Sequence, residues 1–102
     1  MDNVKVYLPI FYDDNLPSVN LKELCAGIEE EGVPYVVKPI KNENNVISPS
    51  PLEVKIIVKE DKMDVFHEKL QKGPYLTKSK GNERLLGKNA ARIVKGVSLS
   101  IE

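Results

Sequence analysis

The stretch LKELCAGIEEEGVPY, Leu21 to Tyr35, contains a whole helix, the signal that ends it and the start of a strand. Four apolar residues recur at i, i+3, i+4 and i+7, the spacing of an amphipathic helix that packs on one side: Leu21, Leu24, Cys25 and Ile28. Gly32 is expected to end this helix, and a strand is expected from Val33. The stretch therefore predicts a helix followed by a strand.

The opposite face of this helix carries acidic residues. At roughly 100° per residue, Glu23 and Glu30 project away from the apolar stripe, with the small residues Ala26 and Gly27 beside them. Negative charge in the last turn, Glu29 to Glu31, is disfavoured by the helix macrodipole by about 0.3–1 kcal/mol per charge, and a cation would relieve it. Two interpretations remain open: an ordinary solvated face, since Glu is a good helix former, or a face that binds a cation or a partner.

The composition restricts the class of protein. With 102 residues the chain is expected to be one domain, 1–102. Fifteen basic and fifteen acidic residues cancel and only 6% of residues are aromatic, which argues against a nucleic-acid binder. No apolar run approaches the roughly 20 residues of a membrane span, and the start lacks a signal peptide's features, so a cytoplasmic protein is expected. The single Cys25 cannot form an intrachain disulfide and is expected in the core.

The segment before the helix is expected to be a strand and a polar turn. Val4 to Tyr12 is rich in β-branched and aromatic residues, and Ser18 or Asn20 can cap the helix that follows. Asp13 and Asp14 favour a turn. They also suggest a phosphoacceptor pocket, but the third expected strand ends in residues that do not complete one.

The middle of the chain predicts a second strand over Val33–Ile40, an exposed loop over Lys41–Pro51 and a third strand over Leu52–Lys59. Residues 61–71 fit either a short helix or a returning hairpin strand. The alternation in Met63–Glu68 favours the hairpin.

The C-terminal part predicts a polar strand over Tyr75–Lys80 near a sheet edge and a helix capped by Asn82 and ended by Gly96. Gly87 inside this helix costs about 1 kcal/mol relative to Ala. Either the helix begins at Lys88 or another backbone approaches closely there. The order of elements predicts a three-layer α/β domain with a mainly parallel sheet of four or five strands, helices on its faces and a hairpin edge.

Two segments carry a family resemblance: GIEEEGVPYVV, Gly27–Val37, and GKNAARIVKGVSL, Gly87–Leu99. They resemble the small subunit of diol dehydratase and glycerol dehydratase reactivating factors, whose patterns are close to GIEEEG(I/V)P(F/Y) and GNNAARLVKGIPF. Ser50–Leu70 can be laid along that family's strand, charged turn and returning strand, which places His67 on the family's histidine. Without companion ligands, His67 is expected to be a hydrogen-bonded strand residue. The chain departs from the pattern in its first loop, in a shortened middle and at Lys88, where the family has Asn.

The resemblance implies an accessory subunit without chemistry of its own. Its partner would be a large actin-like ATPase subunit that holds ATP or ADP, and the two would form a chaperone that releases damaged cobalamin from diol or glycerol dehydratase by subunit exchange. The middle Glu of the first motif would complete an interfacial Mg²⁺ site built mainly by the large subunit, and it falls on Glu30. The isolated chain would hold no cofactor.

The residues expected at this interface belong to the two motifs: Ala26, Gly27, Glu29, Glu30, Glu31, Asn89, Arg92 and Lys95. For Asn89, Arg92 and Lys95, support of the fold is an equal alternative. Two other functions remain open: a structural medium subunit of a cobalamin-dependent dehydratase, and a small flavodoxin-like enzyme or phosphoacceptor with a pocket near Asp13 and Asp14.

Overall fold

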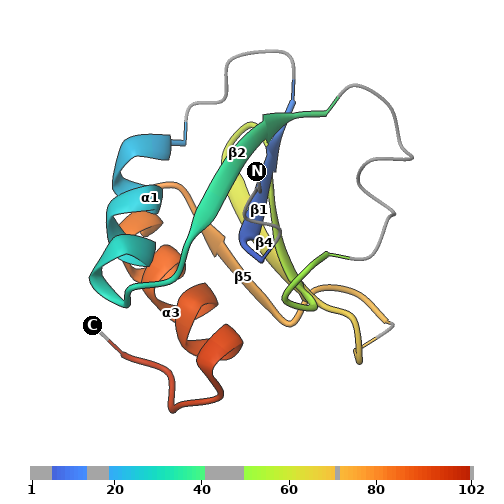
Figure 1. Ribbon diagram of the computed structural model, residues 1–102. Helices are drawn as coiled ribbons and strands as arrows, with labels where there is room; N and C mark the ends of the chain where they lie inside the picture. The colour runs from blue at the N-terminus through green and yellow to red at the C-terminus, as the bar shows by residue number, and fades with distance from the viewer. Residues whose placement is uncertain (1–5, 14–18, 41–49, 71, 102) are drawn as a thin grey trace, which may run out of the picture.

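The computed structural model describes residues 6–13, 19–40, 50–70 and 72–101, which form five strands and two helices (Figure 1). In chain order these elements are β1 Leu8–Tyr12, α1 Leu21–Glu30, β2 Tyr35–Pro39, β3 Val54–Val58, β4 Lys62–His67, β5 Leu76–Ser79 and α3 Glu83–Lys95. The expectations for Val4, Asp14, Ser18 and most of the 41–51 loop concern residues outside these ranges.

The strands form one mixed sheet in the order β2-β1-β3-β4-β5. β1 pairs in parallel with β2 and with β3, whereas β3–β4 and β4–β5 are antiparallel. The predicted hairpin is confirmed, with Ile56 opposite Val65, so residues 62–67 form a strand rather than a helix. Two of the four strand pairs are parallel, so the sheet is less parallel than expected. The short turn between β3 and β4 cannot hold the crossover that a parallel pair requires.

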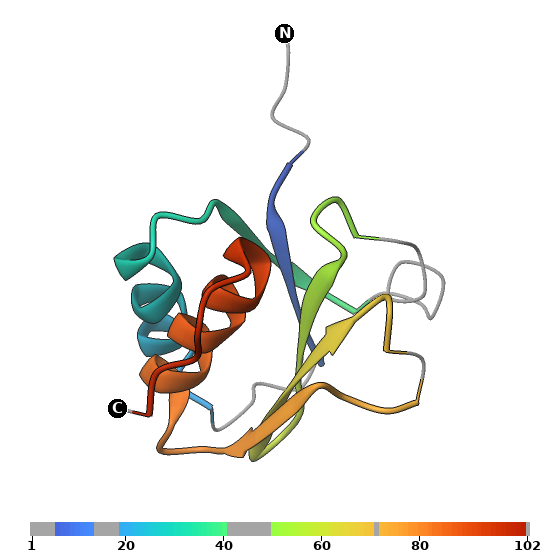
Figure 2. The ribbon, with the colours of Figure 1, turned by 90° about the horizontal axis from the view of Figure 1, so that it is seen from below.

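Both described helices lie on the same side of the sheet (Figure 2), so these residues form two layers rather than the expected three. β3 shows why one face is covered: Val54, Ile56 and Val58 are buried, and the alternate residues Lys55 and Ile57 are only partly buried. The buried face of β3 joins Leu24 and Ile28 of α1 and Leu86 of α3 in one core cluster. The amphipathic stripe predicted for α1 therefore faces the sheet, although Cys25 of that stripe is only partly buried.

The two helices cross at a pair of glycines. A Cβ atom on Gly27 would lie 2.1 Å from the Arg84 carbonyl oxygen, and one on Gly87 would lie 2.1 Å from the Leu24 carbonyl oxygen. The close backbone approach predicted at Gly87 is confirmed, and α3 begins at Glu83 rather than at Lys88. The same contact buries Gly27, so α3 covers the side of α1 that the helical geometry had suggested was open to solvent.

Side chains and glycine satisfy most of the helix ends, but the Asn82 cap predicted for α3 is not formed. The Asn82 side chain makes no capping hydrogen bond, and its Nδ2 donates to the Ser79 carbonyl at 3.2 Å instead. Asn20 caps α1 by accepting a hydrogen bond from the Glu23 amide at 3.1 Å, as predicted. The buried Glu83 carboxylate accepts from the amides of Asn20, at 3.0 Å, and Gly81, at 2.9 Å, so it joins the starts of both helices. Gly96 ends α3 with a φ of 73°, in the left-handed region that favours glycine. Among the residues described, no helix is long and apolar enough to cross a membrane.

Candidate functional site

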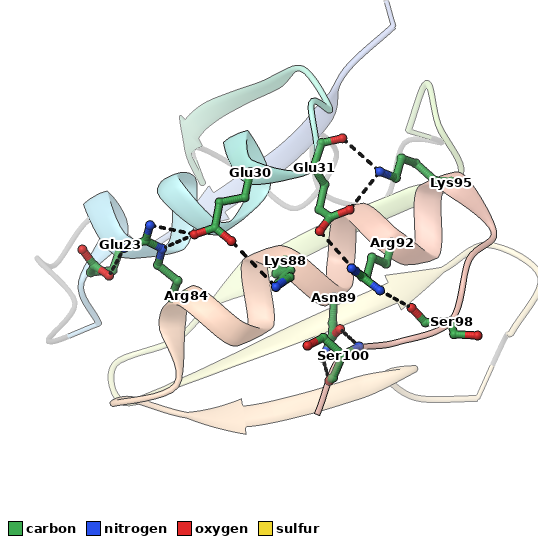
Figure 3. Close-up of polar contacts among 10 residues, drawn as sticks. All are labelled: Glu23, Glu30, Glu31, Arg84, Lys88, Asn89, Arg92, Lys95, Ser98 and Ser100. Carbon is green, nitrogen blue, oxygen red and sulfur yellow. Dashed lines mark hydrogen bonds and ion pairs between the residues drawn. The ribbon is translucent and has the colours of Figure 1, made fainter. Parts of the chain in front are cut away.

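The two sequence motifs meet where α1 crosses α3. Figure 3 shows acidic residues at the C-terminal end of α1 facing basic residues spaced along α3. These pairs join positions 54 to 64 residues apart in the chain. Most of the residues predicted for the interface lie at this crossing. They form one group of ion pairs around Glu30, a second group around Glu31, and a set of hydrogen bonds from α3 to the C-terminal tail, which we call the clamp.

Glu30 lies in the more exposed group. Its Oε2 atom accepts from Arg84 Nε at 2.7 Å and lies 2.6 Å from Arg84 Nη2, and its Oε1 atom lies 3.9 Å from Lys88 Nζ. Arg84 also reaches Glu23 at 3.4 Å, and the two carboxylates raise the pKa of its guanidinium. The side chains of Glu30 and Arg84 are 37% and 54% exposed. Exposed pairs of this kind contribute little to folding and can be rearranged by a partner.

Glu31 lies in the more enclosed group. Its carboxylate accepts from Lys95 Nζ at 2.8 Å and from Arg92 Nε at 3.1 Å, and its side chain is 10% exposed. Hydrogen bonding by Lys95 and Arg92 lowers the pKa of the Glu31 carboxyl. Lys95 also donates to the Glu31 carbonyl oxygen at 3.1 Å, beside the negative end of the α1 dipole. The cation expected to relieve the charge at this helix end therefore comes from α3 of the same chain.

Glu29 points to the opposite side of α1, away from α3. Its carboxylate accepts a hydrogen bond from the Tyr35 hydroxyl at the start of β2, and this bond raises the pKa of Tyr35. The same residues line a hollow together with Cys25 and the partly buried Ala26. Burial raises the pKa of the Cys25 thiol, which keeps it protonated and poorly nucleophilic.

Asn89 and Arg92 hold the segment that follows α3. Asn89 is buried; its Nδ2 donates to the Ser100 carbonyl at 2.9 Å, and its Oδ1 accepts from the Ser100 amide at 2.6 Å (Figure 3). Arg92 Nη1 donates to the Ser98 carbonyl at 2.9 Å. Asn89 and Arg92 therefore support the fold, which is one of the two roles that the sequence left open for them.

Arg84 and Lys88 belong to the site but were not among the residues predicted for it. The signal was present, because positions 84, 88, 92 and 95 follow the i, i+4, i+8, i+11 spacing that places side chains along one helix face. His67 behaves as predicted for a strand histidine: it is partly buried, and its Nδ1 accepts from the Lys69 amide at 3.1 Å. Asp13 lies exposed just after β1.

The described residues contain no group of three His, Cys, Asp or Glu side chains that could hold a metal ion. Glu30 faces two cations of its own chain instead of further carboxylates. This arrangement does not fit a divalent cation within the single chain. The predicted Mg²⁺ ligand role of Glu30 depends on groups from a partner.

Residues 8–100 match the family described as dehydratase medium subunit. The chain belongs to the dehydratase medium subunit family. Within this member, the first motif supplies the last turn of α1 and the start of β2. The second motif supplies α3 from Gly87 onward and most of the tail, and the two motifs pack directly on each other.

Two solved structures are similar to this member of the dehydratase medium subunit family over nearly their whole length. One is a diol dehydratase-reactivating factor complexed with ADP and Mg²⁺, with a TM-score of 0.77 and 26% identity over 93% of this chain and 97% of that chain. The other is a glycerol dehydratase reactivase, with a TM-score of 0.75 and 28% identity over 93% of this chain and 96% of that chain. The comparison with curated proteins gave no match.

Proposed function

We propose that this chain is the small subunit of an ATP-dependent reactivating factor that releases damaged cobalamin from diol or glycerol dehydratase. The observation that supports this most is that both similar structures come from reactivating factors and match nearly the whole of both chains. In this proposal the large partner subunit is an actin-like ATPase that holds the nucleotide and Mg²⁺. The small subunit performs no chemistry.

Membership of a family described as dehydratase medium subunit supports the proposed subunit exchange. A chain shaped like a dehydratase subunit can compete for the same surface on a third protein. The direction of exchange is then set by the difference between two interface free energies, which nucleotide binding to the large subunit can shift. A small domain that presents the right surface is sufficient for this role.

The charges at the helix crossing suit a binding subunit. Glu31 is satisfied inside the chain, by Lys95 and Arg92, and is therefore assigned to the fold. Glu30 and Arg84 are more exposed, and a partner could exchange their mutual contact for contacts across an interface. We therefore propose that Glu30 on the α3 side, together with Ala26 and Glu29 in the hollow beside Tyr35, contacts the large subunit.

We propose that Glu30 is one ligand of a Mg²⁺ ion at this interface and that the large subunit supplies the other ligands. For Glu30 to bind the ion, Arg84 and Lys88 would have to turn away, because they lie 2.6 Å and 3.9 Å from its carboxylate oxygens.

The second candidate is a structural medium subunit of the dehydratase, and the description of the family favours it directly. The two functions differ in the partner: an ATPase in the first case and the remaining dehydratase subunits in the second. Nothing in the described geometry favours a flavodoxin-like enzyme or phosphoacceptor.

The test is a pull-down from the source cell's lysate with the tagged chain as bait, with and without ATP and Mg²⁺, followed by mass spectrometry. A dehydratase medium subunit serves as the matched control bait. We expect this chain to recover an actin-like ATPase whose association responds to nucleotide. Recovery of dehydratase subunits alone, by both baits, would overturn the proposal in favour of the structural subunit.

A further inference from the structure

The segment after α3 is held to the helix by side chains of α3. Asn89 binds the amide and carbonyl of Ser100, and Arg92 binds the carbonyl of Ser98, so the backbone is fixed at alternate residues (Figure 3). The intervening apolar residues project outward, with Val97, Leu99 and Ile101 being 48%, 41% and 91% exposed.

These residues adjoin two exposed hydrophobic residues, Leu70 and Tyr75, of the connection between β4 and β5. Val97 and Leu99 line a hollow together with Leu70, Tyr75, Lys69 and Ile93, here named the tail groove. Of the seven large hydrophobic residues exposed within the described ranges, five lie on the tail or on this connection: Leu70, Tyr75, Val97, Leu99 and Ile101. Scattered apolar residues are ordinary on a surface, but such a concentration marks an interaction site.

The residues that line the tail groove include one lysine, Lys69, whereas the neighbouring Glu68 accepts a hydrogen bond from the Ser50 amide at 2.7 Å. Lys69 lines the groove and Lys72 follows in the same connection, and neither forms an ion pair with any of the residues described. By contrast, Lys88 and Lys95 at the helix crossing both face glutamates. No Asp or Glu is among the residues that line the tail groove. An occupant that carries a carboxylate is favoured.

A second copy of the chain fits this surface poorly. A two-fold symmetric contact joins the same patch on both copies, so it would place the Lys69 ammonium groups of both copies in one interface. Like charges across an interface oppose association. A different protein with acidic residues beside an apolar segment meets both properties of the tail groove.

We propose that the tail groove docks an apolar, carboxylate-bearing segment of the large partner subunit. This inference rests on the proposed function and adds a second contact surface, built from different residues than the ion pairs of the helix crossing. The apolar side chains of Val97 and Leu99 supply the buried contact, Lys69 supplies the charge selection, and the clamp by Asn89 and Arg92 presents the tail already ordered.

The test measures the affinity of purified variants for the purified large reactivase subunit. The double substitution Val97→Ser, Leu99→Ser is expected to weaken binding about tenfold or more, the loss typical when central apolar contacts are removed. The control is Val36→Ser, which removes a Val of similar exposure, 39%, from β2 at the opposite edge of the sheet and is expected to leave affinity unchanged. Thermal unfolding of each variant verifies that the fold is intact.

The charge is tested separately by Lys69→Glu, with Lys62→Glu at the far end of β4 as the control. Lys69→Glu is expected to weaken binding about tenfold at low salt and by less at high salt, because screening reduces the contribution of an exposed charge. A second readout is hydrogen exchange of the tail amides, which should slow when the wild-type chain joins the complex.

Three outcomes would overturn the inference. If the wild-type chain binds the large subunit and the groove variants bind as tightly as their controls, the tail groove is not the docking surface while the proposed function stands. Self-association of the wild-type chain that Val97→Ser, Leu99→Ser abolishes would identify a second copy as the occupant. Failure of the wild-type chain to bind the large subunit at all would remove both this inference and the proposed function.

Discussion

Glu30 and Glu31 are neighbours in the sequence, and both face pairs of cations on α3, yet they lie in different surroundings. The Glu31 side chain is 10% exposed and is held by Lys95 and Arg92, whereas Glu30 is 37% exposed and its principal partner, Arg84, is 54% exposed. Solvent screens the Glu30 pair and leaves it replaceable. The comparison indicates that one carboxylate of the motif supports the fold and the next is available to a partner.

The largest expected effect comes from Gly87→Ala, which removes the crossing on which both groups depend. The new Cβ would lie 2.1 Å from the Leu24 carbonyl oxygen, so the helices must move apart. We expect a loss of about 2–3 kcal/mol in the free energy of unfolding, despite the better helix propensity of Ala. Urea unfolding measures it, with Lys88→Ala at the next position as a control expected to change stability little.

Next in size is the effect of Glu31→Gln, which tests the comparison directly. The substitution removes the charge that Lys95 and Arg92 enclose, so the melting temperature should fall. The matched substitution Glu30→Gln should cost at most about 1 kcal/mol, because its pair is exposed. Equal melting temperatures for the two variants would contradict the distinction between the groups.

The pH dependence sharpens the same distinction. The pKa of Glu31 is lowered in the folded chain, mainly by its hydrogen bond with Lys95, so the folded state favours the ionised form. Its contribution to stability is therefore present above the unfolded-state pKa, about 4.3, and is lost as pH falls through the lower folded value. The gap in melting temperature between wild type and Glu31→Gln should be full at pH 7 and should close at acidic pH. A gap that persists at the lowest pH would show that packing, not charge, is responsible.

The smallest effect on folding and the clearest one on assembly are expected for Glu30→Ala. The fold should survive, because the exposed pair with Arg84 adds little, while affinity for the large subunit in the presence of Mg²⁺ should fall about fivefold or more. The measurement is a binding titration with Mg²⁺ and with a chelator. Unchanged affinity in Mg²⁺ would refute the metal-bridging role, and Lys88→Asn, which removes the ammonium 3.9 Å from the Glu30 carboxylate, tests whether this ammonium alters the need for the ion.

Local signals in the sequence were sufficient for most of the elements. The apolar stripe and Asn20 cap predicted α1, Gly96 predicted the end of α3, and alternation in residues 63–68 predicted the β3–β4 hairpin. These features depend on contacts between residues close in the chain, where side-chain spacing and backbone preferences act directly. The motifs also led to the family, because GIEEEG and the GKNAAR segment are specific strings.

The sequence by itself therefore determined the α/β class, the hairpin edge and the family, whereas the tertiary structure decided what the motif residues face. Helical geometry directed Glu30 and Gly27 away from the apolar stripe, but it contains no information about α3, which begins more than fifty residues later and covers that side. The placement of both helices on one face, and the tail groove, likewise arise from contacts between distant segments. Such contacts depend on the packing of the whole core, which no local pattern specifies.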